Sequence, residues 1–205
     1  MRAALAGLGL PSSPRVLAIY RAINEGLWAA YRRGEIVQSV LEVERFRRLL
    51  EALSAREDRA PRLARAFLAR LSSRGDLLPG CRRVLGALRR RRFALGVVTN
   101  GIDRVQHARL RAAGLRSYFD TVVTSEGCGF AKPDPRILHT ALQALGIAPA
   151  AAVYVGDDVA VDGGAAARAG TAFVWVDGGY VLPRGLRRPR LRVTHLRELP
   201  SLLAL

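Results

Sequence analysis

The stretch Phe93-Ala94-Leu95-Gly96-Val97-Val98, followed directly by Thr99-Asn100-Gly101, decides the fold. A short run of apolar residues that ends in a turn signal predicts a buried strand. The same pattern recurs further along the chain, with helical patterns between the runs. Strands are expected at residues 119–123, 152–155 and 172–176, and helices at residues 103–113, 135–145 and 161–169. This alternation predicts a Rossmann-like α/β core, in which helices cover both faces of a parallel sheet.

The region upstream of this core, residues 14–73, carries a helical pattern and no strand signal. Its apolar residues recur at three- and four-residue spacing, which is typical of amphipathic helices. The second and third of these helices are expected at about residues 36–53 and 61–71. The chain is therefore expected to consist of a helical segment, residues 1–76, and an α/β core, residues 77–205.

Composition limits the class of protein. A chain of 205 residues that is 50% hydrophobic and 24% charged is globular and large enough for a core. Cys81 and Cys128 lie far apart and show neither a disulfide framework nor metal-ligand spacing, so a cytoplasmic location is expected. No apolar run approaches the roughly 20 residues of a membrane span. The apolar residues 3–10 lack a clear cleavage site, so no signal peptide is expected.

The net charge of +16 suggests a nucleic-acid partner at first sight. The arginines are nevertheless spread along the whole chain, and few aromatic residues alternate with them. Charge alone is weak evidence for such a partner. We therefore expect no specific nucleic-acid partner, and any binding to RNA or DNA should vanish steeply with modest salt.

One residue stands out against this arginine background. The chain has 32 arginines and a single lysine, Lys132, within Gly129-Phe130-Ala131-Lys132-Pro133-Asp134-Pro135. Arginine is a planar fork, whereas lysine is a compact and flexible point charge. A crowded anionic pocket with room for one ammonium group would explain why lysine occurs at this position. Chance is the other explanation, and it would suffice if the neighbouring motifs did not also resemble an anion-binding site.

Polar residues follow three successive strands. Thr99-Asn100-Gly101 comes after the first, the loop ending in Lys132 after the second, and Gly156-Asp157-Asp158 with Asp162 after the third. Each group alone has a structural reading as a turn or a helix cap. Together they meet where open α/β sheets bind ligands, beyond the carboxyl ends of the strands. A hydroxyl, an ammonium and several carboxylates suit a phosphate held against Mg²⁺.

These groups resemble the second, third and fourth motifs of the haloacid dehalogenase-like hydrolases. The matching residues are Val98-Thr99-Asn100-Gly101, then Ala131-Lys132-Pro133, then Val155-Gly156-Asp157-Asp158 with Asp162. The helical segment resembles the α-helical cap of that family. Within it, the stretches from Tyr20 to Trp28 and from Tyr31 to Ile36 resemble the cap of its pyrimidine 5′-nucleotidase branch.

The resemblance implies a role for each matched residue. Thr99, Asn100 and the backbone of Gly101 would bind the transferring phosphoryl group, and Lys132 would neutralise phosphate and carboxylate charge together. Asp157 would bind Mg²⁺, and Asp158 or Asp162 would bind the ion or hold its waters. In the cap, Asn24 is the first candidate for base recognition. Trp28 is a candidate for stacking on the base, although a core position explains it as well.

The first motif of the family, Asp-x-Asp, does not occur in this sequence. In the family its first aspartate is the nucleophile that forms an aspartyl-phosphate, and its second is the acid and base. Residues 1–10 read as the opening helix of the cap, so the central first strand is also expected to be absent. Three explanations stay open: an N-terminally truncated sequence, a pseudoenzyme, or a strand supplied by a second chain. Since the nucleophile is missing from it, the 205-residue chain as given is expected to show no Mg²⁺-dependent phosphatase activity above background.

The function expected of the parent protein is Mg²⁺-dependent hydrolysis of small phosphate monoesters, with pyrimidine nucleoside 5′-monophosphates as the leading substrates. A sugar-phosphate or phosphoglycolate phosphatase is the alternative enzyme. Outside enzymes, the alternative is a catalytically inactive nucleotide-binding or nucleic-acid-associated protein. The sequence does not fix the oligomeric state.

Overall fold

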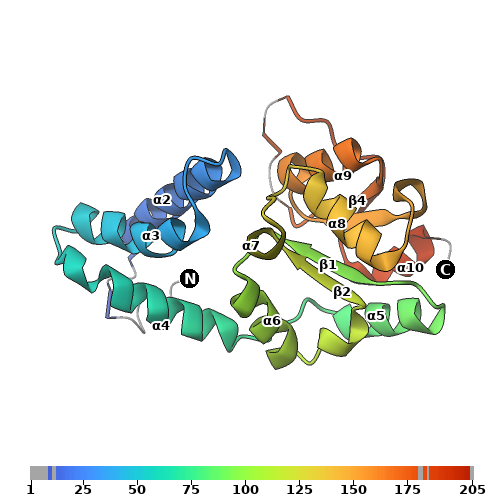
Figure 1. The fold of residues 1–205 in the computed structure, drawn as a ribbon, viewed down its shortest axis with the longest axis horizontal. Coiled ribbons are helices and arrows are strands. Elements are labelled where there is room, and N and C mark those ends of the chain that lie inside the picture. Colours follow the sequence, from blue (N-terminus) through green and yellow to red (C-terminus); the bar gives the residue numbers. More distant parts are fainter. Residues whose placement is uncertain (1–8, 11–12, 180–181, 184, 204–205) are drawn as a thin grey trace. The chain divides into compact units, whose positions relative to one another are not determined.

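The protein divides into two compact units, Met1–Arg74 and Gly75–Leu205. The computed structural model describes residues 9–10, 13–179, 182–183, 185–203 (Figure 1). The boundary between the units lies two residues before the one expected from the sequence. Residues 1–8, which make up most of the expected opening helix of the cap, lie outside the described part of the chain.

The described part of the first unit contains three amphipathic α-helices, α2 (Pro14–Arg32), α3 (Gln38–Ala52) and α4 (Ala60–Ser72). Ser13 caps α2 by accepting a hydrogen bond from the Val16 amide (3.3 Å), and the αL conformation of Gly34 follows its end. The unit is held by an aromatic cluster in which the Phe46 and Phe67 rings meet edge to face at 5.4 Å. These helices match the sequence-based expectation.

An ion-pair network on α3 makes this unit sensitive to acid. The Arg47 guanidinium, assisted by Arg48 and opposed by partial burial, lowers the pKa of Glu44 to about 2. A carboxylate with a depressed pKa stabilises the fold above its unfolded pKa, and that contribution is lost as pH falls from about 4.5 toward 2. Because the Arg47 and Arg48 side chains are about half exposed, we expect the contribution to be only about 1 kcal/mol.

The measurement is amide hydrogen exchange of α3 in the parent chain and in Glu44→Gln. The variant should lose about 1 kcal/mol of protection at pH 6 and almost none at pH 2. Glu25→Gln, at an exposed position of α2, is the matched control and should leave α3 unchanged at both pH values. A Glu44→Gln effect that persists at pH 2 would contradict this account.

The second unit alternates helices and short strands. Its elements in chain order are α5 (Cys81–Arg90), β1 (Gly96–Thr99), α6 (Asp103–Ala112), β2 (Thr121–Thr124), α7 (Ser125–Cys128), α8 (Arg136–Leu145), β3 (Val153–Gly156), α9 (Gly164–Ala169), β4 (Ala172–Val176), β5 (Arg192–Val193) and α10 (Leu199–Leu202). All strand pairs are parallel. The unit is therefore an α/β fold with small parallel sheets, as the alternation predicted.

One detail of the expected sheet is wrong. Instead of one sheet, the described strands form two, β1 with β2 and β3 with β4 and β5, and no strand hydrogen bonds link them. β1 and β2 run side by side, apart from β4 (Figure 1). The first strand also begins at Gly96 rather than Phe93, because the Asp120 carboxylate, not a neighbouring strand, binds the Leu95 amide (2.9 Å).

Apolar side chains pack on both faces of these sheets. On one face Ile137 and Leu138 of α8 pack with Ala165 and Ala166 of α9. On the other face Val84 of α5 and Leu199 of α10 pack with buried strand residues, namely Val174 of β4 and Val193 of β5. The two layers place the carboxyl ends of β1 and β3 at one edge of the unit. None of the described helices has the length and apolar character that crossing a bilayer requires.

Candidate active site

The carboxyl ends of β1 and β3 meet around the ammonium group of Lys132. This side chain is only 8% exposed, and its Nζ donates hydrogen bonds to Asp162 Oδ1 (2.7 Å) and Tyr154 OH (2.7 Å). A third bond reaches the carbonyl oxygen of Val98, at the end of β1 (3.2 Å). The single lysine of the chain is thus a buried, fully engaged cation between two strands.

Asp162 holds both the lysine and the turn that follows β3. Its Oδ1 accepts from Lys132, and its Oδ2 accepts from the backbone amides of Asp157 and Asp158, both at 3.1 Å. Gly156 makes this approach possible, since a Cβ at that position would collide with the Asp162 carboxylate. Both carboxylate oxygens of Asp162 therefore already accept hydrogen bonds from other residues of the protein. In this arrangement Asp162 positions Lys132 and the backbone of Asp157 and Asp158.

Asn100 fixes the loop that carries the lysine. Its Oδ1 accepts from the Lys132 amide (2.6 Å), and its Nδ2 donates to the Lys132 carbonyl oxygen (2.7 Å). Gly101, buried beside it, leaves no room for a Cβ because the Gln106 side chain packs over the backbone. The Asn-Gly pair after β1 therefore clamps the loop from β2 onto the end of β1.

The surroundings keep Lys132 charged. Burial is the largest influence on its pKa and lowers it, but the Coulomb interactions and hydrogen bonds with Tyr154 and Asp162 outweigh burial, so the pKa is raised overall. Burial raises the pKa of Tyr154 to about 12, so this hydroxyl stays neutral at pH 7. The ion-pair partner of the Lys132 ammonium is therefore the Asp162 carboxylate, at 2.7 Å.

Two polar side chains remain available at this edge. Neither the Thr99 hydroxyl nor the exposed Asp157 carboxylate has a hydrogen-bond partner among the described residues, while the Trp175 indole fixes the Asp157 carbonyl oxygen (3.0 Å). Asp158 instead caps the following turn, because its Oδ1 accepts from the Ala160 and Val161 amides (2.9 Å each). The open groups beside Lys132 are therefore one hydroxyl and one carboxylate.

The side chains at this edge provide some, but not all, of the ligands that a Mg²⁺ ion needs. Within the described ranges, no cluster of three or more His, Cys, Asp or Glu side chains is placed to hold a metal ion. Magnesium usually takes only one or two protein carboxylates and completes its shell with water and substrate phosphate. Asp157 can supply one such carboxylate. Asp158 and Asp162, expected from the sequence as further ligands, are engaged with backbone amides in this arrangement.

The expected cap residues lie in the helical unit. Asn24 and Trp28 are one turn apart on α2, so they share one side of that helix. Asn24 Oδ1 accepts a long hydrogen bond from buried Arg45 (3.4 Å), and the half-buried Trp28 ring meets Tyr31 edge to face at 5.7 Å. The structure thus gives both residues contacts within the helical unit.

Sequence reasoning missed Tyr154 as a residue of the site and did not find the role of Gly156. Tyr154 hydrogen-bonds Lys132 and lies between the strands, and its only signal was an aromatic hydroxyl within an otherwise small, apolar strand. Gly156 read as part of a turn, although its role is to admit the Asp162 carboxylate. Neither role follows from spacing along the chain, because both depend on side chains that meet only in the fold.

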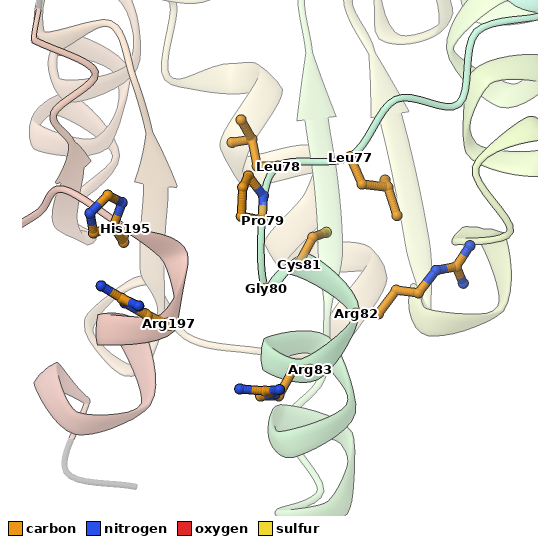
Figure 2. Close-up of a pocket in the computed structure, with 9 residues that line it drawn as sticks. All are labelled: Leu77, Leu78, Pro79, Gly80, Cys81, Arg82, Arg83, His195 and Arg197. Atoms are coloured by element: carbon orange, nitrogen blue, oxygen red, sulfur yellow. The ribbon is translucent and has the colours of Figure 1, made fainter.

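A separate cavity of about 560 Å³ lies at the start of α5, lined by residues 77–83 with His195 and Arg197. Figure 2 shows Arg82 pointing away from His195 and Arg197. The Arg82 guanidinium instead donates to the carbonyl oxygens of Ala113 and Gly114. None of the site residues expected from the sequence lines this cavity.

A lysine held by a buried aspartate at the carboxyl ends of parallel strands lies where open α/β sheets bind their ligands. A family profile described as "haloacid dehalogenase-like hydrolase" matches residues 10–170. The chain therefore belongs to the haloacid dehalogenase-like hydrolases.

Its relatives include phosphatases of different substrates. The chain is 38% identical to a phosphoserine phosphatase of Thermus thermophilus over 193 residues, which cover 92% of this chain and 77% of that protein. It is 34% identical to the pyrimidine 5′-nucleotidase YjjG of Escherichia coli, over 90% of this chain and 80% of that protein. The magnesium-bound crystal structure of the HAD-hydrolase YfnB of Bacillus subtilis superposes with a TM-score of 0.88 at 24% identity, over 100% of this chain and 89% of that chain.

Proposed function

We propose that the Lys132 site belongs to a Mg²⁺-dependent phosphatase of small phosphate monoesters, with pyrimidine nucleoside 5′-monophosphates as the preferred substrates. The observation that carries this proposal is the buried Lys132–Asp162 pair (2.7 Å) beside the open Thr99 hydroxyl and Asp157 carboxylate. The similarity to the pyrimidine 5′-nucleotidase YjjG favours nucleotides, and the similarity to a phosphoserine phosphatase makes phosphoserine the competing substrate.

Each residue has a task in this reaction. Lys132 offsets the negative charge of the phosphoryl group, and the Thr99 hydroxyl donates a hydrogen bond to one of its oxygens. Asn100 positions Lys132 by clamping its loop. Asp157 would hold Mg²⁺, which supplies charge neutralisation when bound. Asn24 and Trp28 of the helical unit are the residues proposed to contact the base.

The nucleophile of this chemistry, the first aspartate of an Asp-x-Asp motif, is proposed to come from outside residues 1–205. The 205-residue chain should therefore release no phosphate above background from UMP, phosphoserine or glyceraldehyde 3-phosphate, with or without Mg²⁺. Substantial turnover by the purified chain would contradict this assignment of the nucleophile.

The activity test uses the chain extended at its N-terminus by an apolar strand that ends in Asp-x-Asp. We expect Mg²⁺-dependent phosphate release with UMP preferred over phosphoserine. Thr99→Val should lower the rate about 100-fold, because it removes one donor to the transferring group. Thr140→Val, at an exposed position of α8, is the matched control and should leave the rate unchanged. A preference for phosphoserine would overturn the nucleotide assignment, and an inactive extended chain would overturn the phosphatase assignment.

A further inference from the structure

Arg45 of the helical unit is a buried cation without an acidic partner. The residue is only 5% exposed and lies on α3, which packs against α2. Among the described residues, no Asp or Glu forms an ion pair with Arg45. Its Nε donates to the Leu41 carbonyl oxygen (3.1 Å), and its guanidinium lies over the Phe67 ring (5.7 Å). A buried charge destabilises a fold unless it is paired or hydrogen-bonded, so the remaining donors of Arg45 need acceptors.

The hydroxyl of Tyr20, near Arg45, does not supply the missing negative charge. Tyr20 is only 1% exposed. Burial raises its pKa, and the charge and hydrogen bonding of Arg45 offset this effect only in part, so the hydroxyl remains protonated at neutral pH. One turn further along α2, Asn24 does present an acceptor. Its Oδ1 accepts a hydrogen bond from Arg45 Nη1 at 3.4 Å.

This contact decides which end of the Asn24 amide faces the interior of the unit. Arginine carries donors and no acceptor, so the amide oxygen must be the atom next to Arg45. The Nδ2 group is therefore turned away from the guanidinium. It has no hydrogen-bond partner among the described residues, and it is not buried. The half-buried Asn24 side chain thus offers a hydrogen-bond donor in a fixed orientation.

Trp28 places an aromatic ring next to this donor. It follows Asn24 by one helical turn, about 6 Å along the axis of α2, and its ring is half-buried. A base that stacks on an aromatic ring leaves its edge open to hydrogen bonds from neighbouring side chains. A fixed donor selects a base edge that carries an acceptor. Uracil and thymine have the carbonyl oxygen O4 where cytosine has the amino group N4.

We propose that Arg45 fixes Asn24 as a hydrogen-bond donor to the O4 carbonyl of a uracil-type base, and thereby makes UMP a better ligand than CMP. This inference rests on the proposed function, because it assigns the specificity of the same site. Asn24 determines specificity, and Arg45 is a positioning residue that acts through Asn24. With cytosine, the N4 amino group would face the Nδ2 donor and leave both groups unpaired, which disfavours binding.

The test measures equilibrium binding of UMP, CMP and ribose 5-phosphate to the 205-residue chain with Mg²⁺, by isothermal titration calorimetry. Because the nucleophile lies outside this chain, the ligands should not be consumed. UMP should bind at least tenfold more tightly than CMP. Asn24→Asp replaces the donor by an acceptor while its other oxygen stays with Arg45, so this variant should bind CMP at least tenfold more tightly than UMP. Ribose 5-phosphate, which has no base, should bind the parent chain and the variant equally.

Two further variants separate positioning from structure. Arg45→Met frees the Asn24 amide to turn, so the preference for UMP should fall below about threefold. The charge that it removes has no acidic partner among the described residues, so the variant should keep the helical content of the parent chain in circular dichroism. Gln143→Glu, in the exposed last turn of α8, is the control for the added negative charge and should keep the parent's preference.

The outcomes distinguish this inference from the proposed function. Equal binding of UMP and CMP by the parent chain would overturn the inference, as would an Asn24→Asp variant that still prefers UMP. Ribose 5-phosphate binding as tightly as UMP would mean that the base is not recognised, and it would leave the phosphate site at Lys132 standing. If none of the three ligands binds, the phosphate site itself is wrong, and both proposals are overturned.

Discussion

Replacing Lys132 by methionine should destabilise the α/β unit by about 3–5 kcal/mol, because the change leaves the buried Asp162 charge without its cation. Asp162 is only 5% exposed, so water cannot solvate its carboxylate in place of the lysine ammonium. The free energy of unfolding can be measured by urea denaturation in a Trp28→Phe background. There the buried Trp175 reports the α/β unit alone.

The control for this prediction is the double variant Lys132→Met with Asp162→Asn. The asparagine oxygen can still accept a backbone amide, and no buried charge is left unpaired, so most of the lost stability should return. A loss below about 1 kcal/mol in the single variant would mean that Lys132 and Asp162 are solvated, contrary to their burial.

Gly156→Ala should destabilise the same unit by about 2–4 kcal/mol. A methyl group at this position meets the Asp162 carboxylate, which must move away from the amides of Asp157 and Asp158. Hydrogen bonds to a charged group contribute about 1.5–3 kcal/mol each to stability, so losing or lengthening both should lower the free energy of unfolding substantially. The same urea denaturation followed at Trp175 measures the effect.

Gly86→Ala is the matched control within the same unit. Gly86 lies inside helix α5, and a Cβ there meets only the flexible end of Arg90. The substitution should therefore stabilise the unit by about 0.5–1 kcal/mol through the higher helix propensity of alanine. If Gly156→Ala and Gly86→Ala gave the same result, the close approach of Asp162 to the β3 turn would be contradicted.

The sequence predicted the elements well where the pattern was local. Helical periodicity located α3 and α8 to within a few residues, and Val-rich runs located β1 and β4. It also placed the groups around Lys132 together, because the carboxyl ends of parallel strands share one edge.

Local patterns could not show what each site residue does. Asp158 and Asp162 looked equivalent as metal ligands, yet one caps a turn and the other holds Lys132. The pairing of the described strands, β1 with β2 and β3 with β4 and β5, could not be predicted from the strand runs, since these runs give no information on which edges pair. Pairing is decided by contacts between residues far apart in the chain.

The engagement of Lys132 has a practical consequence for chemical labelling. This residue carries the sole side-chain amine of the protein, and it is buried with three hydrogen-bond partners. Reagents that acylate amines need the neutral, accessible form of the group, which the raised pKa and the burial of Lys132 both withhold. In the folded protein such reagents should therefore leave Lys132 unmodified. Acylation of Lys132 would then report directly on the opening of the α/β unit.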